Sequence, residues 1–268
     1  MTDFRMSTTL ALAPTSAHRI HEIDTPLIPV AQVIARLGTN PTITVPMVAG
    51  IEPDVDGIWR YVKEPADFFD VPIPDRGALH TALARFAAAH GHERALIAVT
   101  VTVLEIDGGP DFVVTGIGVD RVHRTGVRVA GCDAALPVPR TTDPTWLRMA
   151  ARTTSRGSVD QIRRWLSEGG YADGVPAGTF AGAPLIGALV YDVTGELVGI
   201  ENPEPTSVLD QLERCGVVNG VARVDERPVH ARRAWWISPN FETHPVLSIG
   251  DALYRIDPEV VPPFLEPR

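Results

Sequence analysis

The sequence predicts a mixed α/β (α+β) fold in two subdomains, and three observations support this prediction. Apolar segments with strand periodicity alternate with amphipathic helical segments along the chain. The first half holds a hairpin pattern, in which residues 95–105 and 111–119 flank a Gly-Gly-Pro turn. A basic stretch within residues 140–175 precedes a helical pattern in the middle of the chain. A chain of 268 residues is long enough for two subdomains that share an interface.

Composition argues against several classes of protein. The formal net charge of −9 at pH 7 argues against a general nucleic-acid binder. No apolar run approaches the length of a membrane span. Cys132 and Cys215 are far apart in sequence, so a disulfide framework is not expected. We therefore expect a cytoplasmic protein without membrane or nucleic-acid partners, beginning with a flexible arm at residues 1–16.

Lysine is almost absent from the chain. Of the 24 basic residues counted as Lys plus Arg, only Lys63 is a lysine. Arginine stays protonated and cannot form a Schiff base. Any mechanism that needs a lysine amine must therefore use Lys63.

Residues 17–135 form the smaller predicted subdomain. In chain order we expect a short helix ending at Gly38, strands at 43–50 and 56–63, a helix at 77–90, the hairpin at 95–119 and a strand at 126–129. The strand at 56–63 is predicted because side chains alternate through D-G-I-W-R-Y-V-K. The helix at 77–90 is predicted because leucines and Phe86 recur at helical spacing in an Ala-rich segment.

Residues 136–268 form the larger predicted subdomain, which carries the presumed pocket. In chain order we expect a basic loop, a helix from Ser158 to Gly169, a hairpin at 186–201, a helix from Thr206 or Ser207 to Gly216, strands at 222–229 and 234–238, and a hairpin at 245–256. Ser158 and Gln161 form an S-x-x-Q capping box, which indicates the start of the first helix.

Four stretches, by their order and spacing, resemble the class IV aminotransferases and the related aminodeoxychorismate lyases, the fold-type IV family of pyridoxal phosphate (PLP) enzymes. They are D-G-I-W-R-Y-V-K at 56–63, G-V-R-V at 126–129, the central helix with G-G-Y-A-D-G-V and the hairpin after it, and the segment from A-W-W-I-S to P-V-L-S-I-G-D. The resemblance implies the D-amino acid aminotransferase-like fold with two subdomains, and a homodimer.

The chain departs from this family at the positions that hold the cofactor. The family lysine is expected near residues 149–152, where the chain has Met-Ala-Ala-Arg. The glutamate that contacts the pyridine nitrogen is expected near residue 199, where the chain has Gly199, and Glu201 comes two residues late. The segment with the phosphate-binding arginine is largely missing, and Arg76 is a poor substitute. The resemblance therefore implies the fold and argues against the usual cofactor, although PLP stays possible.

An anion site is the feature of the family that we expect to survive. The resemblance places phosphate at a helix start and beside a threonine before the P-V strand. Thr206 and Ser207 open a predicted helix, and Thr243 precedes His244-Pro245-Val246. Because backbone N–H groups at a helix start bind anions, a substrate carboxylate or phosphate is expected there.

Three arginines precede the central helix: Arg148, Arg152 and Arg156. We predict that they bind a substrate carboxylate, since guanidinium groups pair with carboxylates in a bidentate manner. A solvated basic loop explains them equally well.

Other residues are candidates through the same resemblance. Trp59 and Tyr61 are expected to line the pocket, with core or interface packing as the alternative. Glu201 is a candidate general acid or base and Asn202 a hydrogen-bonding group, although both suit a loop cap before proline.

His244 is the second candidate proton carrier, because it lies in the motif that lines the family's pocket and imidazole titrates near neutrality. Asn240 and Thr243 from the same motif are expected to bind substrate. A structural role is the alternative for this histidine. His90 and His92 would need a third ligand to hold a metal ion, so we assign no metal ligands.

The sequence thus favours an enzyme that acts on a small amino- or keto-carboxylate without PLP. Lyase, isomerase, cyclase and hydrolase reactions all suit acid–base and electrostatic groups. One alternative is a non-catalytic protein of the same fold that binds a ligand or a partner. A second alternative is a conventional PLP-dependent aminotransferase or aminodeoxychorismate lyase.

Overall fold

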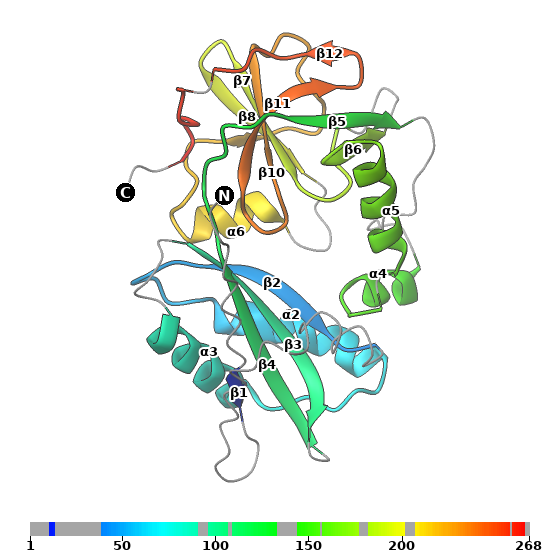
Figure 1. Ribbon diagram of the computed structural model, residues 1–268. Coiled ribbons are helices and arrows are strands. Elements are labelled where there is room, and N and C mark those ends of the chain that lie inside the picture. The colour runs from blue at the N-terminus through cyan, green and yellow to red at the C-terminus, as the bar shows by residue number, and fades with distance from the viewer. Residues whose placement is uncertain are drawn as a thin grey trace. The chain divides into compact units, whose positions relative to one another are not determined.

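The computed structural model describes residues 11–13, 39–90, 96–106, 109–132, 144–155, 157–176, 182–201, 207–257 and 259–265. The chain divides into two compact units (Figure 1). Unit 1 comprises residues 1–119 and 143–156, and unit 2 comprises residues 120–142 and 157–268. This division differs from the predicted one at 135/136, because the chain enters unit 2 earlier and returns to unit 1 for residues 143–156.

Unit 1 is built on a four-stranded antiparallel sheet in the order β1-β4-β3-β2. Its strands are β1 (Ala11–Ala13), β2 (Thr42–Met47), β3 (Ile97–Ile106) and β4 (Gly109–Gly118). The predicted hairpin and the strand near 43–50 are thereby confirmed. Of the predicted arm, Ala11–Ala13 form a strand, and the rest lies outside the described residues, as does the predicted helix ending at Gly38.

Helices α2 (Val55–Phe68) and α3 (Arg76–His90) cover the sheet of unit 1 (Figure 1). The predicted helix at 77–90 is confirmed as α3. Its fully buried side chains Leu79 and Leu83 pack in one cluster with Phe112 of the sheet. Burying a large apolar side chain contributes roughly 1.5–3 kcal/mol, so this stripe fixes α3 on the sheet.

The predicted strand at 56–63 is wrong, because these residues belong to helix α2. Asp54 begins the helix, and its side chain accepts a hydrogen bond from the Gly57 N–H at 2.9 Å. The buried residues Ile58, Val62 and Ala66 recur at a spacing of four. Ile58 and Val62 fit both a strand pattern and a helical pattern, because the segment has only eight residues. The helix cap at Asp54, before the segment, decides in favour of the helix.

The predicted basic loop is also wrong in part, because residues Thr145–Ala151 form helix α4 in unit 1. Met149 is buried, while Trp146 is 58% exposed. The helix ends at Ala151 with Arg152 as its C-cap, and Thr153 forms an antiparallel bridge with Pro41. This short helix contacts α2 and places Arg152 beside it.

Unit 2 holds a mixed sheet in the order β6-β5-β11-β10-β7-β8-β9, with β12 paired to β11. Its strands are β5 (Val127–Cys132), β6 (Asp173–Pro176), β7 (Ala188–Val193), β8 (Glu196–Glu201), β9 (Ala222–Arg223), β10 (Arg233–Ile237), β11 (Thr243–Ile249) and β12 (Ala252–Leu253). Strands β6, β5 and β11 run parallel, and β10, β7 and β8 continue antiparallel.

The described residues of unit 2 also form two helices, both of which were predicted. Helix α5 (Gly157–Glu168) covers β6, and the shorter α6 (Val208–Arg214) packs beside β8. The Ser158 side chain of the predicted capping box lies outside the described residues. The strand predicted at 222–229 is shorter than expected, since β9 spans two residues. Within the described residues, no helix is both long and apolar enough to cross a membrane.

A buried carboxylate fixes the start of β6. Asp173 is fully buried and accepts hydrogen bonds from the backbone N–H groups of Gly174, Leu185, Ile186 and Gly187. The indole N–H of Trp236 also donates to it, at 2.8 Å. Burial raises the pKa of Asp173 to about 6, while these donors act in the opposite direction. The carboxylate therefore links β6, the segment before β7, and β10.

Candidate functional site

The predicted site residues of unit 1 lie in structural contacts. The Arg152 side chain is 11% exposed and donates to the Glu64 carboxylate and to the Tyr61 carbonyl oxygen. Its guanidinium carbon lies 3.8 Å from the Tyr61 ring centroid. Arg152 therefore attaches the end of α4 to α2, and is already paired instead of being poised for a substrate.

Trp59 and Arg148 also belong to unit 1. Trp59 packs against the apolar core, and its indole N–H donates to the Pro74 carbonyl oxygen at 3.2 Å. This contact supports the packing alternative for Trp59. Arg148 lies in the last turn of α4, and Arg156 lies outside the described residues.

Lys63 lies on α2, where its side chain is 37% exposed. Its ammonium group lies 2.5 Å from both carboxylate oxygens of Asp67, one helical turn later. It also lies 5.7 Å from the Trp59 ring centroid. The only lysine is thus a surface residue in a local ion pair.

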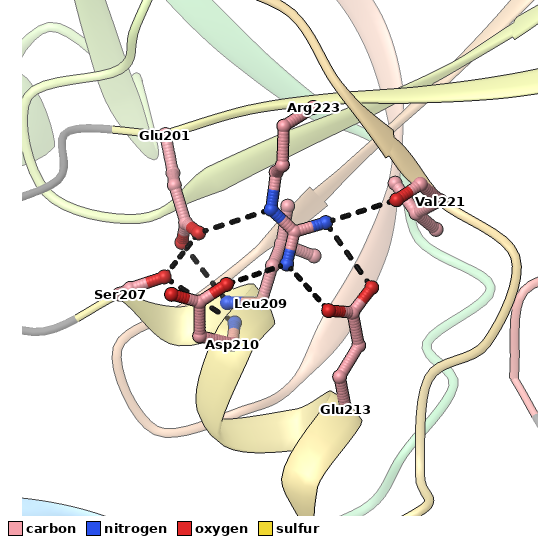
Figure 2. Close-up of polar contacts among 7 residues, drawn as sticks. All are labelled: Glu201, Ser207, Leu209, Asp210, Glu213, Val221 and Arg223. Atoms are coloured by element: carbon pink, nitrogen blue, oxygen red, sulfur yellow. Dashed lines mark hydrogen bonds and ion pairs between the residues drawn. The ribbon is translucent and has the colours of Figure 1, made fainter.

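The start of α6 holds a polar network that includes two predicted residues, Glu201 and Ser207 (Figure 2). Glu201, at the end of β8, has an 8% exposed side chain. Its carboxylate accepts hydrogen bonds from the Ser207 hydroxyl and, at 2.9 Å, from the Leu209 N–H. The Nε atom of Arg223 lies 3.6 Å away. Glu201 and Ser207, both predicted site residues, are therefore brought together.

Arg223 connects this carboxylate to the rest of α6 (Figure 2). Its Nη2 atom lies 3.0 Å from both the Asp210 and the Glu213 carboxylates. Burial raises the pKa of Glu201, and the Ser207 and Leu209 hydrogen bonds and the Arg223 charge lower it in part. Arg223 was not predicted as a site residue; it lies 22 positions beyond Glu201, and no local pattern links the two.

Glu201 occupies the position at which an anion would meet the start of α6. Its oxygens accept the Ser207 hydroxyl and a free backbone N–H of the first turn, which are the donors that a phosphate would use. Ser207 in turn caps the Asp210 N–H at 3.3 Å. Two donors of the predicted anion site, the Ser207 hydroxyl and the Leu209 N–H, are therefore engaged by the chain's own carboxylate. Asn202 and Thr206 lie outside the described residues.

His244 belongs to a second cluster, which also contains His123 and Glu242. The two imidazole rings stack with centroids 4.1 Å apart and planes 10° apart. His123 Nε2 lies 3.6 Å from Glu242 Oε1. Burial, and next the charge of His123, lower the pKa of His244 to about 4, while a hydrogen bond to the Thr125 backbone acts in the opposite direction. His244 is therefore neutral at pH 7.

The other predicted residues near His244 have backbone roles. Thr243 is buried, and its backbone pairs with the loop before β5: its carbonyl oxygen accepts the His123 N–H at 2.9 Å. Asn240 is exposed in the turn between β10 and β11, and its N–H donates to the Ser238 hydroxyl. The sequence analysis missed His123 and Glu242, although Glu242 lies two residues before His244, a spacing that puts two side chains on one side of an extended chain.

This architecture matches solved structures of fold-type IV transaminases. A fold IV transaminase from Curtobacterium pusillum has a TM-score of 0.60 and 17% identity over 93% of this chain and 94% of its own. A hypothetical aminotransferase from Mycobacterium tuberculosis, solved with alpha-ketoglutarate and pyridoxamine phosphate (PMP), has a TM-score of 0.62 and 17% identity over 93% and 94%. A putative branched-chain aminotransferase from Thermotoga maritima has a TM-score of 0.59 and 14% identity over 93% and 90%.

The chain therefore has the class IV aminotransferase fold, as the resemblance implied. No family model matches its sequence, and no curated protein sequence matches it significantly. At these identities the likeness shows the fold, so the chemistry has to be argued from the chain's own residues.

Three positions test whether the residues suit PLP. Position 199, where the resemblance expects a glutamate, is a buried glycine, and a Cβ there would lie 2.7 Å from both Leu209 Cδ1 and Val221 Cγ1. The donors at the start of α6 already hold Glu201. The only lysine is the paired surface residue of α2. These positions do not fit the cofactor in the manner that the resemblance implies.

Proposed function

We propose that the chain is an enzyme of the class IV aminotransferase fold that works without covalent PLP chemistry on a small amino- or keto-carboxylate. The observation that carries the proposal is Glu201, whose carboxylate accepts from the Ser207 hydroxyl and the Leu209 N–H at the start of α6, two donors that could otherwise bind a cofactor phosphate. Two negatively charged groups cannot share these donors without strong repulsion. The closed space at Gly199 supports the same conclusion.

The substrate class comes from the structural neighbours. One of them was solved with alpha-ketoglutarate, a dicarboxylate keto acid. A substrate of this kind needs cationic or N–H donors for its carboxylate. Arg152 is already paired with Glu64 and the Tyr61 carbonyl oxygen, so we assign it no substrate-binding role.

The proton-transfer role falls to the histidine cluster. A neutral imidazole can accept a proton from a substrate carbon or from water. His244 is neutral at pH 7, and the Glu242 carboxylate lies in the same cluster, where it can stabilise the positive charge that forms on the ring. Glu201 is less suited, because its oxygens are engaged by Ser207, Leu209 and Arg223. Lyase, isomerase, cyclase and hydrolase steps are all compatible with this group.

Borohydride reduction after incubation with PLP tests the proposal. We expect no stoichiometric pyridoxyl adduct, and only slow labelling of the exposed Lys63, which the variant Lys63→Arg removes. A thermal-shift screen of amino acids and keto acids should then raise the melting temperature of both proteins equally, because a ligand of the native state stabilises it. One equivalent of pyridoxyl group on wild-type Lys63, with transaminase activity lost in Lys63→Arg, would overturn the proposal and favour the PLP-dependent alternative.

A non-catalytic binding protein is the second candidate, and a hollow in unit 1 favours it. This hollow has a volume of about 450 Å³ and is lined mainly by apolar side chains of the β2 end, the following loop and α3. His80 and Glu52, 3.9 Å apart, are its titratable lining residues. Binding of a keto acid without turnover, unchanged in a His244→Ala variant, would favour this candidate.

A homodimer, expected from the resemblance, is tested by light scattering.

A further inference from the structure

The histidine cluster of unit 2 has the composition of a metal site. His123, Glu242 and His244 each offer one ligand atom, and these atoms lie within 4.8 Å of one another. Two imidazole nitrogens and one carboxylate oxygen are the protein ligands of many catalytic zinc sites. All three residues are half-buried, with side-chain exposures of 30% for His123 and 39% for Glu242.

The backbone holds the three residues together. Residues 121–123 run beside the start of β11: Thr243 N–H donates to the Arg121 carbonyl oxygen at 3.1 Å, and His123 N–H donates to the Thr243 carbonyl oxygen at 2.9 Å. This pairing places His123 next to His244. The turn after β10 places Glu242, whose N–H donates to the Ser238 hydroxyl at 3.1 Å.

Two buried ring nitrogens in the cluster lack hydrogen bonds. His123 Nε2 and His244 Nδ1 have no hydrogen-bond partner among the residues that the structure describes. Buried polar atoms without partners are costly, and each such atom in a native protein calls for an explanation such as an unseen ion. Glu242 divides its oxygens accordingly: Oε1 faces His123, and Oε2 lies 3.4 Å from the Ser238 hydroxyl.

We propose that His123, Glu242 and His244 bind a divalent transition-metal ion, with Zn²⁺ as the preferred ion. The two rings are nearly parallel, and a ring nitrogen binds a metal in the plane of its own ring. One ring must therefore turn about its side-chain torsions on binding, and we assign this turn to His123, whose side chain is 30% exposed. Three protein ligands leave a coordination position for water or a substrate oxygen.

This proposal deepens the proposed function, on which its catalytic part rests. A metal ion at this cluster would supply a Lewis acid and a bound water, and His244 would then act as a ligand. Metal binding itself needs no substrate, so it can be measured separately. Zn²⁺ binding without any turnover would support the metal site and contradict the proposed enzymatic function.

Equilibrium dialysis of the full chain against Zn²⁺, followed by metal analysis, tests the site. We expect about one equivalent bound and a Zn²⁺-dependent rise in melting temperature. His123→Asn and Glu242→Gln should each weaken binding by tenfold or more. Both residues are partly exposed, so the variants are expected to fold, and circular dichroism without metal verifies this. Co²⁺ should give the absorption bands of a site with nitrogen and oxygen ligands.

His230→Asn is the matched control, because His230 is an exposed histidine in the same unit. This variant should bind Zn²⁺ as the wild type does. The proposal is overturned if wild-type protein binds less than about 0.1 equivalent at micromolar Zn²⁺. Equal Zn²⁺ affinity of wild type and a folded His123→Asn/Glu242→Gln double variant would also overturn it.

Discussion

Replacing Glu201 by alanine tests whether its carboxylate occupies an anion site. The change removes an acceptor for the Ser207 hydroxyl and the Leu209 N–H, and one of three carboxylate partners of Arg223. Hydrogen bonds to a charged group contribute about 1.5–3 kcal/mol each. Arg223 keeps two acidic partners, Asp210 and Glu213, so its positive charge stays compensated and adds little to the cost. We expect destabilisation of about 2–4 kcal/mol.

The same variant should regain stability when acetate is added. Acetate can enter the space left by the Glu201 side chain and accept from the Ser207 and Leu209 donors. At ten times its dissociation constant, a ligand of the native state stabilises it by about 1.4 kcal/mol. Urea denaturation followed by circular dichroism, with chloride at equal ionic strength as the control, measures the effect.

Acetate should stabilise only the alanine variant, because only this variant has space beside the Ser207 and Leu209 donors. Glu201→Gln is the matched control, because its amide fills the same space and leaves no room for acetate. Equal stabilisation of wild type, Glu201→Gln and Glu201→Ala by acetate would refute the idea of a vacated site. If Glu201→Ala lowers the free energy of unfolding by less than about 0.5 kcal/mol, the network around Glu201 contributes little to stability.

Two further predictions concern buried positions of unit 2. Because burial raises the pKa of Asp173 to about 6, above its unfolded value of about 3.9, the native state binds this proton more tightly. The contribution of Asp173 to the free energy of unfolding should therefore fall as pH rises from about 4 to 6. Trp236→Phe removes a hydrogen-bond donor that stabilises the ionised form of Asp173. The variant should therefore lose about 1–2 kcal/mol more unfolding free energy at pH 8 than at pH 5, as measured by urea denaturation. An equal loss at both pH values would contradict this. Gly199→Ala should destabilise by about 1–3 kcal/mol, since its Cβ would lie 2.7 Å from Leu209 and Val221, and an unchanged urea midpoint would refute the closed space.

The sequence predicted most elements whose signals are local. The helix at 77–90, the hairpin before residue 119 and the Ser207 cap of α6 follow from periodicity and capping residues that lie within a few positions of one another. The segment at 56–63 failed because eight residues with two shared apolar positions satisfy both strand and helix patterns. The cap that decided the outcome, Asp54, lies before the segment.

The candidate sites depended on contacts between distant residues, which local patterns cannot reveal. Glu201 meets Arg223 through the pairing of β8 with β9, and His244 meets His123 through an isolated bridge between Val122 and Thr243. Arg152 resembled a free cation in a loop, but its partner Glu64 lies 88 positions earlier. The sequence could identify these side chains as candidates, but only the fold decides which are already neutralised.

The single lysine offers a direct way to observe local opening of unit 1. A protease that cuts only after lysine has one target in the whole chain, the peptide bond between Lys63 and Glu64. This bond lies in the middle of α2, so the helix must unwind before the chain can enter the protease. The cleavage rate therefore reports how often α2 opens, from two fragments of predictable size and without any engineered label.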